Sequence, residues 1–276
     1  MNMCRIFFLY PGLVFTINSI ARVPTSFLFF TTEQTLFPDK ISKLGFYQDI
    51  VKKNIAPGIY SFDVNTPLWS DGAFKQRFII LPNDSQITYS DTTAFRFPIG
   101  TVFVKNFMLD TINGDSASRI YVETRILFKQ SEGLEDKPDW MGITYAWDAN
   151  QLDATLVAQE GLTVSIPIHK PEANGIVLSK KWPFPSQQEC FRCHIPKARQ
   201  VLGFFSAQLN QDLIGTKEKN QLQNFVENGL FVGKDFSDFS KSHSWSSIKD
   251  SSKSLEQRVR SYFGANCSSC HSPEAY

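Results

Sequence analysis

The sequence has 276 residues and a formal net charge of +1, so its overall charge indicates neither a nucleic acid nor an anionic membrane as a partner. Hydrophobic residues make up 42% of the chain and aromatic residues 14%, which is enough for a packed core and excludes a disordered protein. The length allows one large domain or two ordinary ones.

The first residues have the features of a secretory signal peptide. Arg5 precedes an apolar run over Ile6–Ile17, and Ser19 and Ala21 supply the small residues that follow such a run. We therefore predict a signal peptide over residues 1–21, with an uncleaved anchor or a buried strand as the alternatives. No second segment is long and apolar enough to span a bilayer, so we expect no membrane span after cleavage.

Residues 22–180 are expected to form a β-rich domain. The chain between residues 60 and 168 is rich in Val, Ile, Phe, Thr and Tyr and is divided by turn clusters such as Asn113-Gly114-Asp115. A short helix is expected before the strands, within Asp39–Asn54. The number and spacing of the strands favour an antiparallel sandwich or barrel. The predicted strands are Gln76–Leu81, Gln86–Tyr89, Gly100–Phe107, Arg119–Lys129, Met141–Trp147 and Leu162–Ile168.

From about residue 181 the pattern changes to helices and loops. Capping boxes predict helix starts at Ser186, with Glu189, and at Ser254, with Gln257. The second of these helices carries an apolar stripe and is expected to end at Gly264. We therefore predict an α+β fold, in which the antiparallel β-rich N-terminal domain is followed by a mainly helical region. We divide this helical region into a first segment, residues 181–253, and a last segment, residues 254–276. Each segment contains one of the two cysteine motifs described next.

Four of the five cysteines fall into two Cys-x-x-Cys-His motifs, and the fifth, Cys4, lies in the predicted signal peptide. Two cysteines separated by two residues and followed by His are the attachment pattern of a c-type haem, in which two thioethers hold the porphyrin and the His binds iron. We therefore predict two covalently bound haem c groups. The predicted cofactor-binding residues are Cys190, Cys193, Cys267 and Cys270, and the predicted iron ligands are His194 and His271.

Other chemistries for the motifs remain open. The four motif cysteines could form a zinc site, although the gap between the motifs is long and zinc would leave both motif histidines unused. They could also act as two dithiol redox pairs. For the sixth position of a haem iron, His243 is the first candidate, followed by His169, Met108 and Met141.

Several segments resemble a family of bacterial secreted proteins described as diheme c-type cytochromes. The resemblance runs from about residue 45 to the C-terminus and implies a periplasmic protein. The last segment resembles the opening of a class I cytochrome c domain, and because family members continue past the second motif, we expect this domain to be incomplete at Tyr276. The segments that carry the resemblance are Asn65–Gly72, Phe97–Val102, Glu123–Arg125, Pro185–His194, Leu202–Phe204, Gln208–Asn210 and Ser254–His271.

Together these features predict a periplasmic diheme c-type cytochrome that transfers electrons between periplasmic redox partner proteins. The alternative is a peroxidase-like haem enzyme or a cytochrome subunit of a periplasmic dehydrogenase. A third possibility is a ligand- or carbohydrate-binding role for the β-rich domain. No Ser-His-Asp set, phosphate loop or carboxylate pair indicates chemistry independent of haem, so no catalytic residue is assigned and an electron carrier is favoured over a catalyst.

Overall fold

The computed structural model describes residues 37–91, 93–132, 139–194, 201–216, 219–233, 239 and 242–271. The predicted signal peptide, with Cys4, lies outside the described residues. Over the ranges just given, no helix combines the length and the apolar character that a bilayer crossing requires.

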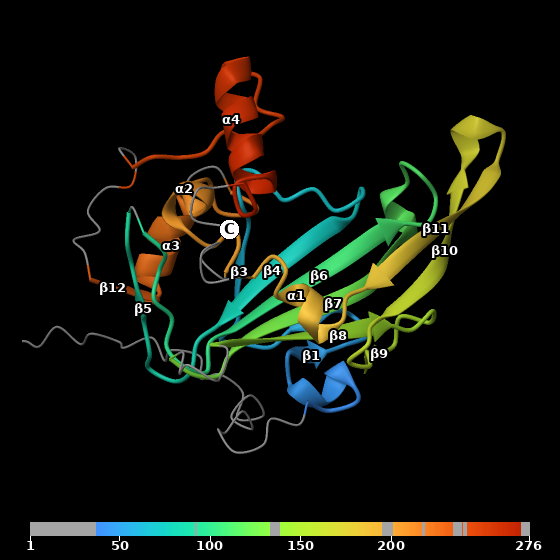
Figure 1. Cartoon of the computed structure of the whole chain (residues 1–276), viewed down its shortest axis with the longest axis horizontal. Coiled ribbons are helices and arrows are strands. Elements are labelled where there is room, and N and C mark those ends of the chain that lie inside the picture. Colours follow the sequence, from blue (N-terminus) through green and yellow to red (C-terminus); the bar gives the residue numbers. More distant parts are fainter. Residues whose placement is uncertain are drawn as a thin grey trace, which may run out of the picture.

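A six-stranded antiparallel sheet forms the centre of the molecule, with the strand order β3-β4-β6-β7-β8-β9 (Figure 1). Every predicted strand position carries a strand. In the described residues, however, six strands form one open sheet and the long strands β10 and β11 form a separate two-stranded sheet, instead of the expected sandwich or barrel. The strands of this sheet are β3 (Tyr60–Phe62), β4 (Phe74–Ile80), β6 (Val102–Asp110), β7 (Arg119–Lys129), β8 (Trp140–Trp147) and β9 (Ala154–Leu156).

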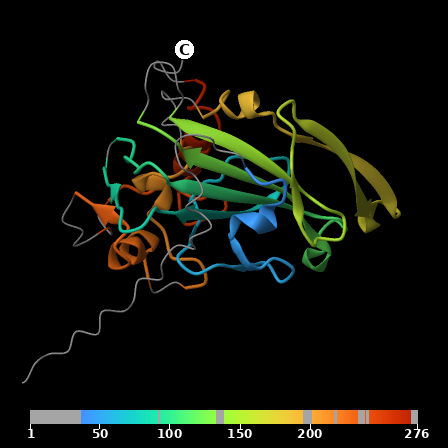
Figure 2. The same cartoon turned by 90° about the horizontal axis from the view of Figure 1, so that it is seen from below.

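Two-stranded sheets flank the large one. The β10–β11 hairpin projects from one end of the molecule, while α2, α3 and α4 gather at the other end (Figures 1 and 2). The strands β5 and β12 pair in parallel and so join segments far apart in the chain. The members of these sheets are β1 (Tyr47–Asp49), β2 (Asn54–Ile55), β5 (Ile87–Thr88), β10 (Leu162–Lys170), β11 (Ile176–Phe184) and β12 (Phe231–Val232).

The prediction of a mainly helical C-terminal region is wrong. Of the helices that the structure describes, only α4 is longer than two turns, and strands supply most of the regular structure. β11 continues past the expected boundary because Trp182 and Phe184 bury against the sheet, and α1, α2 and α3 beyond it are short. The helices are α1 (Gln187–Cys190), α2 (Ser206–Leu209), α3 (Gln221–Glu227) and α4 (Leu255–Asn266), with 3-10 turns at Ile41–Leu44, Ser116–Ser118 and Pro171–Ala173.

The helix expected within residues 39–54 is reduced to the 3-10 turn Ile41–Leu44. Gly45 follows that turn with a φ of 70°, a left-handed conformation that stops a helix and that glycine adopts at little cost. Beyond Gly45 the chain enters the β1–β2 pair. The local periodicity was therefore too weak to favour a helix over strand pairing.

Both predicted capping boxes are confirmed, at Ser186 with Glu189 and at Ser254 with Gln257. Helix α4 does not end at Gly264, however, but continues to Asn266. The missing side chain at Gly264 instead makes room for Trp245, because a Cβ there would lie 2.7 Å from the edge of the Trp245 ring. The apolar stripe of α4 is largely exposed, with Leu255 at 68% and Phe263 at 56%.

The two faces of the large sheet differ. One face carries an aliphatic and aromatic cluster that includes Phe78, Val104 and Tyr145 and packs against the segment 41–47. The other face has a cluster at each end, one joining Phe103 to Phe204 and to helix α3, the other packing the sheet against β11. The predicted domain boundary at residue 180 remains a prediction, and the first of these clusters spans it.

Candidate functional site

The two Cys-x-x-Cys-His motifs have the same local structure. In each motif, the second cysteine donates its backbone N–H to the carbonyl of the first, at 3.3 Å from Cys193 to Cys190 and at 3.0 Å from Cys270 to Cys267. His194 and His271 make the next bond of the same turn, at 3.1 Å and 2.8 Å to the first cysteine of their own motif. Each motif is therefore one helical turn that extends a capped helix, α1 or α4. All four motif cysteines are free thiols.

The first motif lies on strand β8 of the large sheet. A Cβ placed at Gly142 would lie 2.8 Å from the Cβ and 2.9 Å from the Sγ of Cys190, so only glycine admits this contact. Burial raises the pKa of the Cys190 thiol, and the nearby Arg125 opposes the rise. Burial therefore favours the neutral form of the Cys190 thiol.

Both motifs border one cavity of about 540 Å³. Cys190, Cys193 and His194 line it from the first motif, and Ser268 and Ser269 line it from the second. The structure thus brings together two motifs that are far apart in the sequence. The cysteines and the histidine of the second motif are not among the lining residues of this cavity.

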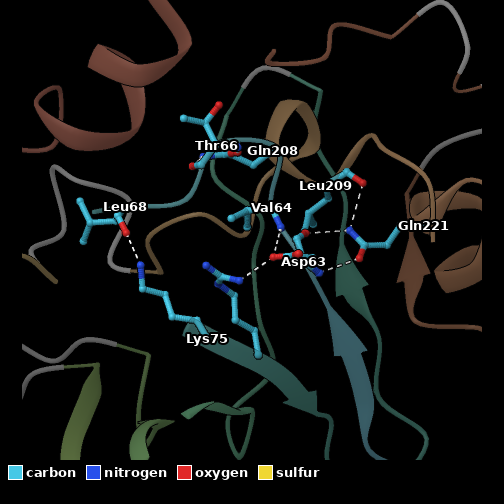
Figure 3. Close-up of polar contacts among 9 residues, drawn as sticks. Asp63, Val64, Thr66, Leu68, Lys75, Gln208, Leu209 and Gln221 are labelled. Atoms are coloured by element: carbon cyan, nitrogen blue, oxygen red, sulfur yellow. Dashed lines mark hydrogen bonds and ion pairs between the residues drawn. The ribbon is translucent and has the colours of Figure 1, made fainter. Parts of the chain in front are cut away.

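The loop over residues 66–73, which precedes β4, is joined to helices α2 and α4 by hydrogen bonds. Thr66 donates its backbone N–H to Gln208 Oε1 at 2.8 Å, and Gln208 Nε2 donates to the Thr66 carbonyl at 2.8 Å (Figure 3). Trp69 donates its backbone N–H to Asn266 Oδ1 at 2.7 Å. Because Asn266 immediately precedes Cys267, this hydrogen bond anchors the second motif to the loop.

The same loop contains a tight turn at residues 70–73. Ala73 N–H donates to the Ser70 carbonyl at 2.9 Å, and the central residues Asp71 and Gly72 have φ values of 51° and 78°. These positive φ values identify the tight turn that an Asp-Gly pair favours. Trp69 is 65% exposed beside it.

The floor of the cavity is cationic. Arg77, Lys105 and Arg125 all line it, and two of them have carboxylate partners. Arg77 Nη1 lies 2.5 Å from Asp63 Oδ1, and Arg125 Nε lies 2.6 Å from Oε1 of the buried Glu123. Sequence reasoning assigned no role to these cations. The available signal was Lys105 itself, a single lysine in the middle of the apolar strand β6.

Asp63 is held in place from the helical side. Its backbone N–H donates to Gln221 Oε1 at 2.8 Å, while Gln221 Nε2 donates to the Asp63 carbonyl at 3.0 Å and to the Leu209 carbonyl at 3.1 Å (Figure 3). The ion pair with Arg77 is thereby coupled to helix α3, which carries Gln221.

The lowered pKa of Lys75 predicts that the free energy of unfolding depends on pH. Burial, with a smaller contribution from Arg77, lowers the pKa of Lys75 from 10.5 to about 8 in the folded chain, where its ammonium donates to the Leu68 carbonyl (Figure 3). Between pH 8 and pH 10.5 the unfolded chain therefore binds more protons at this residue, so the free energy of unfolding rises with pH in that window.

Urea unfolding at intervals across that window measures the effect. We expect the rise with pH to be smaller in Lys75→Met than in the wild type, because the methionine does not titrate. The exposed Lys52→Met is the control and should keep the wild-type slope. Equal slopes in the wild type and Lys75→Met would contradict this prediction.

Of the four residues considered as sixth iron ligands, only one lines the same cavity as His194. His243 lines the cavity together with His194, but His169, Met108 and Met141 do not. Met141 packs with the cluster on the opposite face of the sheet. Met108 is buried in β6, where it lies opposite Tyr121.

The prediction of two covalently bound haem c groups is wrong. Among the residues that the structure describes, no three or more His, Cys, Asp or Glu side chains come together in a group that could hold a metal ion. The same finding removes the alternative zinc site built from Cys190, Cys193, Cys267 and Cys270. That the six motif residues, His194 and His271 included, are the functional positions remains a prediction.

Comparison of the chain with protein-family models, with curated proteins and with solved structures finds no match.

Proposed function

We propose that the chain carries electrons between protein partners outside the cytoplasm and that its redox centre lies at the two Cys-x-x-Cys-His motifs. The observation that carries this proposal is the shared structure of the motifs, which extend two capped helices by the same turn and border one cavity. Two equivalent positions at one cavity suit a protein that passes electrons from one centre to the next.

Burial does not suit Cys190 to act as the nucleophile of a thiol enzyme. A thiol enzyme needs a lowered pKa, because the thiolate is the nucleophile, whereas burial raises the pKa of Cys190. Cys193 and His271 are exposed, so partner proteins can approach both motifs from solvent. Each cysteine pair can form a disulfide by giving two electrons to an oxidised partner protein and two protons to solvent.

The test is protein-film voltammetry of the exported chain, combined with the mass of the intact polypeptide. We expect a reversible signal from two centres. Cys190→Ala with Cys193→Ala should remove one of them, and Cys267→Ala with Cys270→Ala should remove the other. The mass identifies the oxidised state, because each disulfide makes the polypeptide two hydrogens lighter than the corresponding dithiol. A mature N-terminus near Arg22 would support a location outside the cytoplasm.

Ser268→Ala with Ser269→Ala is the matched control, because it alters the second motif without changing its cysteines or its histidine. This control should keep both signals. A wild-type chain without any redox signal would contradict the proposal, and so would a variant lacking all four cysteines that still gives the full signal.

A further inference from the structure

Three cations lie side by side across the middle of the large sheet. Arg77 of β4 is directly opposite Lys105 of β6, and Lys105 is directly opposite Arg125 of β7. Like charges directly opposite one another destabilise a sheet. This row therefore costs free energy in the unliganded protein, and an anion bound to it would recover that cost.

The carboxylates nearby do not neutralise the row. Asp63 pairs with Arg77, and Glu123 pairs with Arg125. The ammonium of Lys105, in the middle, forms no hydrogen bond or ion pair within the described part of the chain, and it lies 5.0 Å from the centre of the Phe107 ring. Its pKa is lowered well below the ordinary value by burial and by the neighbouring positive charges.

The space above the row suits a ligand with an apolar body. The row forms part of the lining of the 540 Å³ cavity, whose other lining residues include Phe103, Leu127, Phe205 and Trp245. A cavity of this size matches the pockets that hold small organic molecules, in which a few charged groups fix the orientation of a largely apolar ligand. An inorganic anion would satisfy the charge and leave the apolar walls without a partner.

We propose that this cavity binds an organic acid, with its carboxylate on Lys105 between Arg77 and Arg125 and its apolar body against the aromatic walls. The proposal goes beyond electron transfer and does not depend on it, because none of these groups belongs to either motif. The carboxylate gains charge-assisted hydrogen bonds, and the row loses its internal repulsion when the acid binds.

The test compares two fluorescent probes with the same apolar body, pyrenebutyric acid and the neutral pyrenebutanol. Titration of the full exported chain at neutral pH should show one site that prefers the acid about 10-fold or more. Lys105→Met should reduce the affinity for the acid to that for the alcohol and leave the alcohol unchanged. Lys105→Arg should retain the preference, and the surface control Lys52→Met should bind both probes as the wild type does.

Two further measurements separate a binding role from a structural one. Without probe, Lys105→Met should melt higher by roughly 2 °C, because the repulsion in the row is relieved. In the wild type, added salt should shrink the preference for the acid. The proposal is overturned if the wild type binds both probes equally, if Lys105→Met keeps the preference, or if salt leaves the preference unchanged.

Discussion

Replacing Glu123 by alanine is expected to lower the free energy of unfolding by about 3 kcal/mol, the largest effect we foresee for a single residue. Glu123 is fully buried and accepts hydrogen bonds from Arg125 at 2.6 Å and 3.0 Å and from Trp182 Nε1 at 3.1 Å. Its removal leaves Arg125 without a counter-charge beside Lys105, and it leaves the buried indole N–H of Trp182 without an acceptor.

Urea unfolding measures this loss against two matched variants. Glu123→Gln keeps the shape and an acceptor for Trp182, so it should cost less than Glu123→Ala. Glu132→Ala removes the partner of Lys129 at a site where the carboxylate is 68% exposed, and it should cost less than about 1 kcal/mol. If Glu123→Ala costs no more than Glu132→Ala, the buried carboxylate does not stabilise the sheet.

The same variant also tests the cationic row. Because Glu123 offsets part of its positive charge, Lys105→Met should recover some of the stability that Glu123→Ala loses. A double-mutant cycle should therefore give a coupling between the two positions of about 0.5–3 kcal/mol. Additive effects would show that the two side chains do not interact.

Replacing Gly142 by valine is expected to displace the first motif and to destabilise the chain by about 1–3 kcal/mol. The new side chain would collide with the Cβ of Cys190, which lies 2.8 Å from the position of the added carbon. A Cβ atom cannot move aside without its backbone, so α1 must shift away from β8.

The displacement can be followed by thiol labelling with peptide mass spectrometry. Cys190 should label at least about 10-fold faster in Gly142→Val, since loss of about 1.4 kcal/mol of local stability changes an opening equilibrium tenfold. Cys267 and Cys270 should label at the wild-type rate. Unchanged labelling of Cys190 would show that α1 does not depend on the contact with Gly142.

Gly264→Ala provides the control at the second motif. Its added Cβ meets the far edge of the Trp245 ring at 2.7 Å, and a ring edge can move by side-chain rotation. Alanine is also a better helix former than glycine by about 1 kcal/mol. We therefore expect Gly264→Ala to change the stability by less than about 1 kcal/mol, in contrast to Gly142→Val.

Local sequence patterns predicted the strands and the helix starts. Strand β7 has the predicted bounds, Arg119–Lys129, because alternating apolar residues specify a strand without reference to the rest of the chain, although most of its residues are buried on both faces of the sheet. The capping boxes at Ser186 and Ser254 are likewise local, since each joins residues only three positions apart. The motif turns at Cys190 and Cys267 extend these two helices.

Long-range pairing could not be predicted from those patterns. The parallel pair of β5 with β12 and the extension of β11 to Phe184 depend on which surfaces meet in three dimensions. For this reason the prediction of a mainly helical C-terminal region was wrong. The stripe of α4 had the period of a buried face, yet Val259 is 39% exposed, because periodicity shows that a face is apolar but not what it packs against.

The sequence by itself determined the chemistry-bearing residues of the motifs, the strand positions and the capped turns, since each depends on neighbours within a few residues. Only the tertiary structure decided that both motifs border one cavity and that Arg77, Lys105 and Arg125 meet in one row on its floor. The physical reason is that the register of β4, β6 and β7 places the three cations opposite one another. That register is set by the packing of the whole sheet and not by the residues within any one strand.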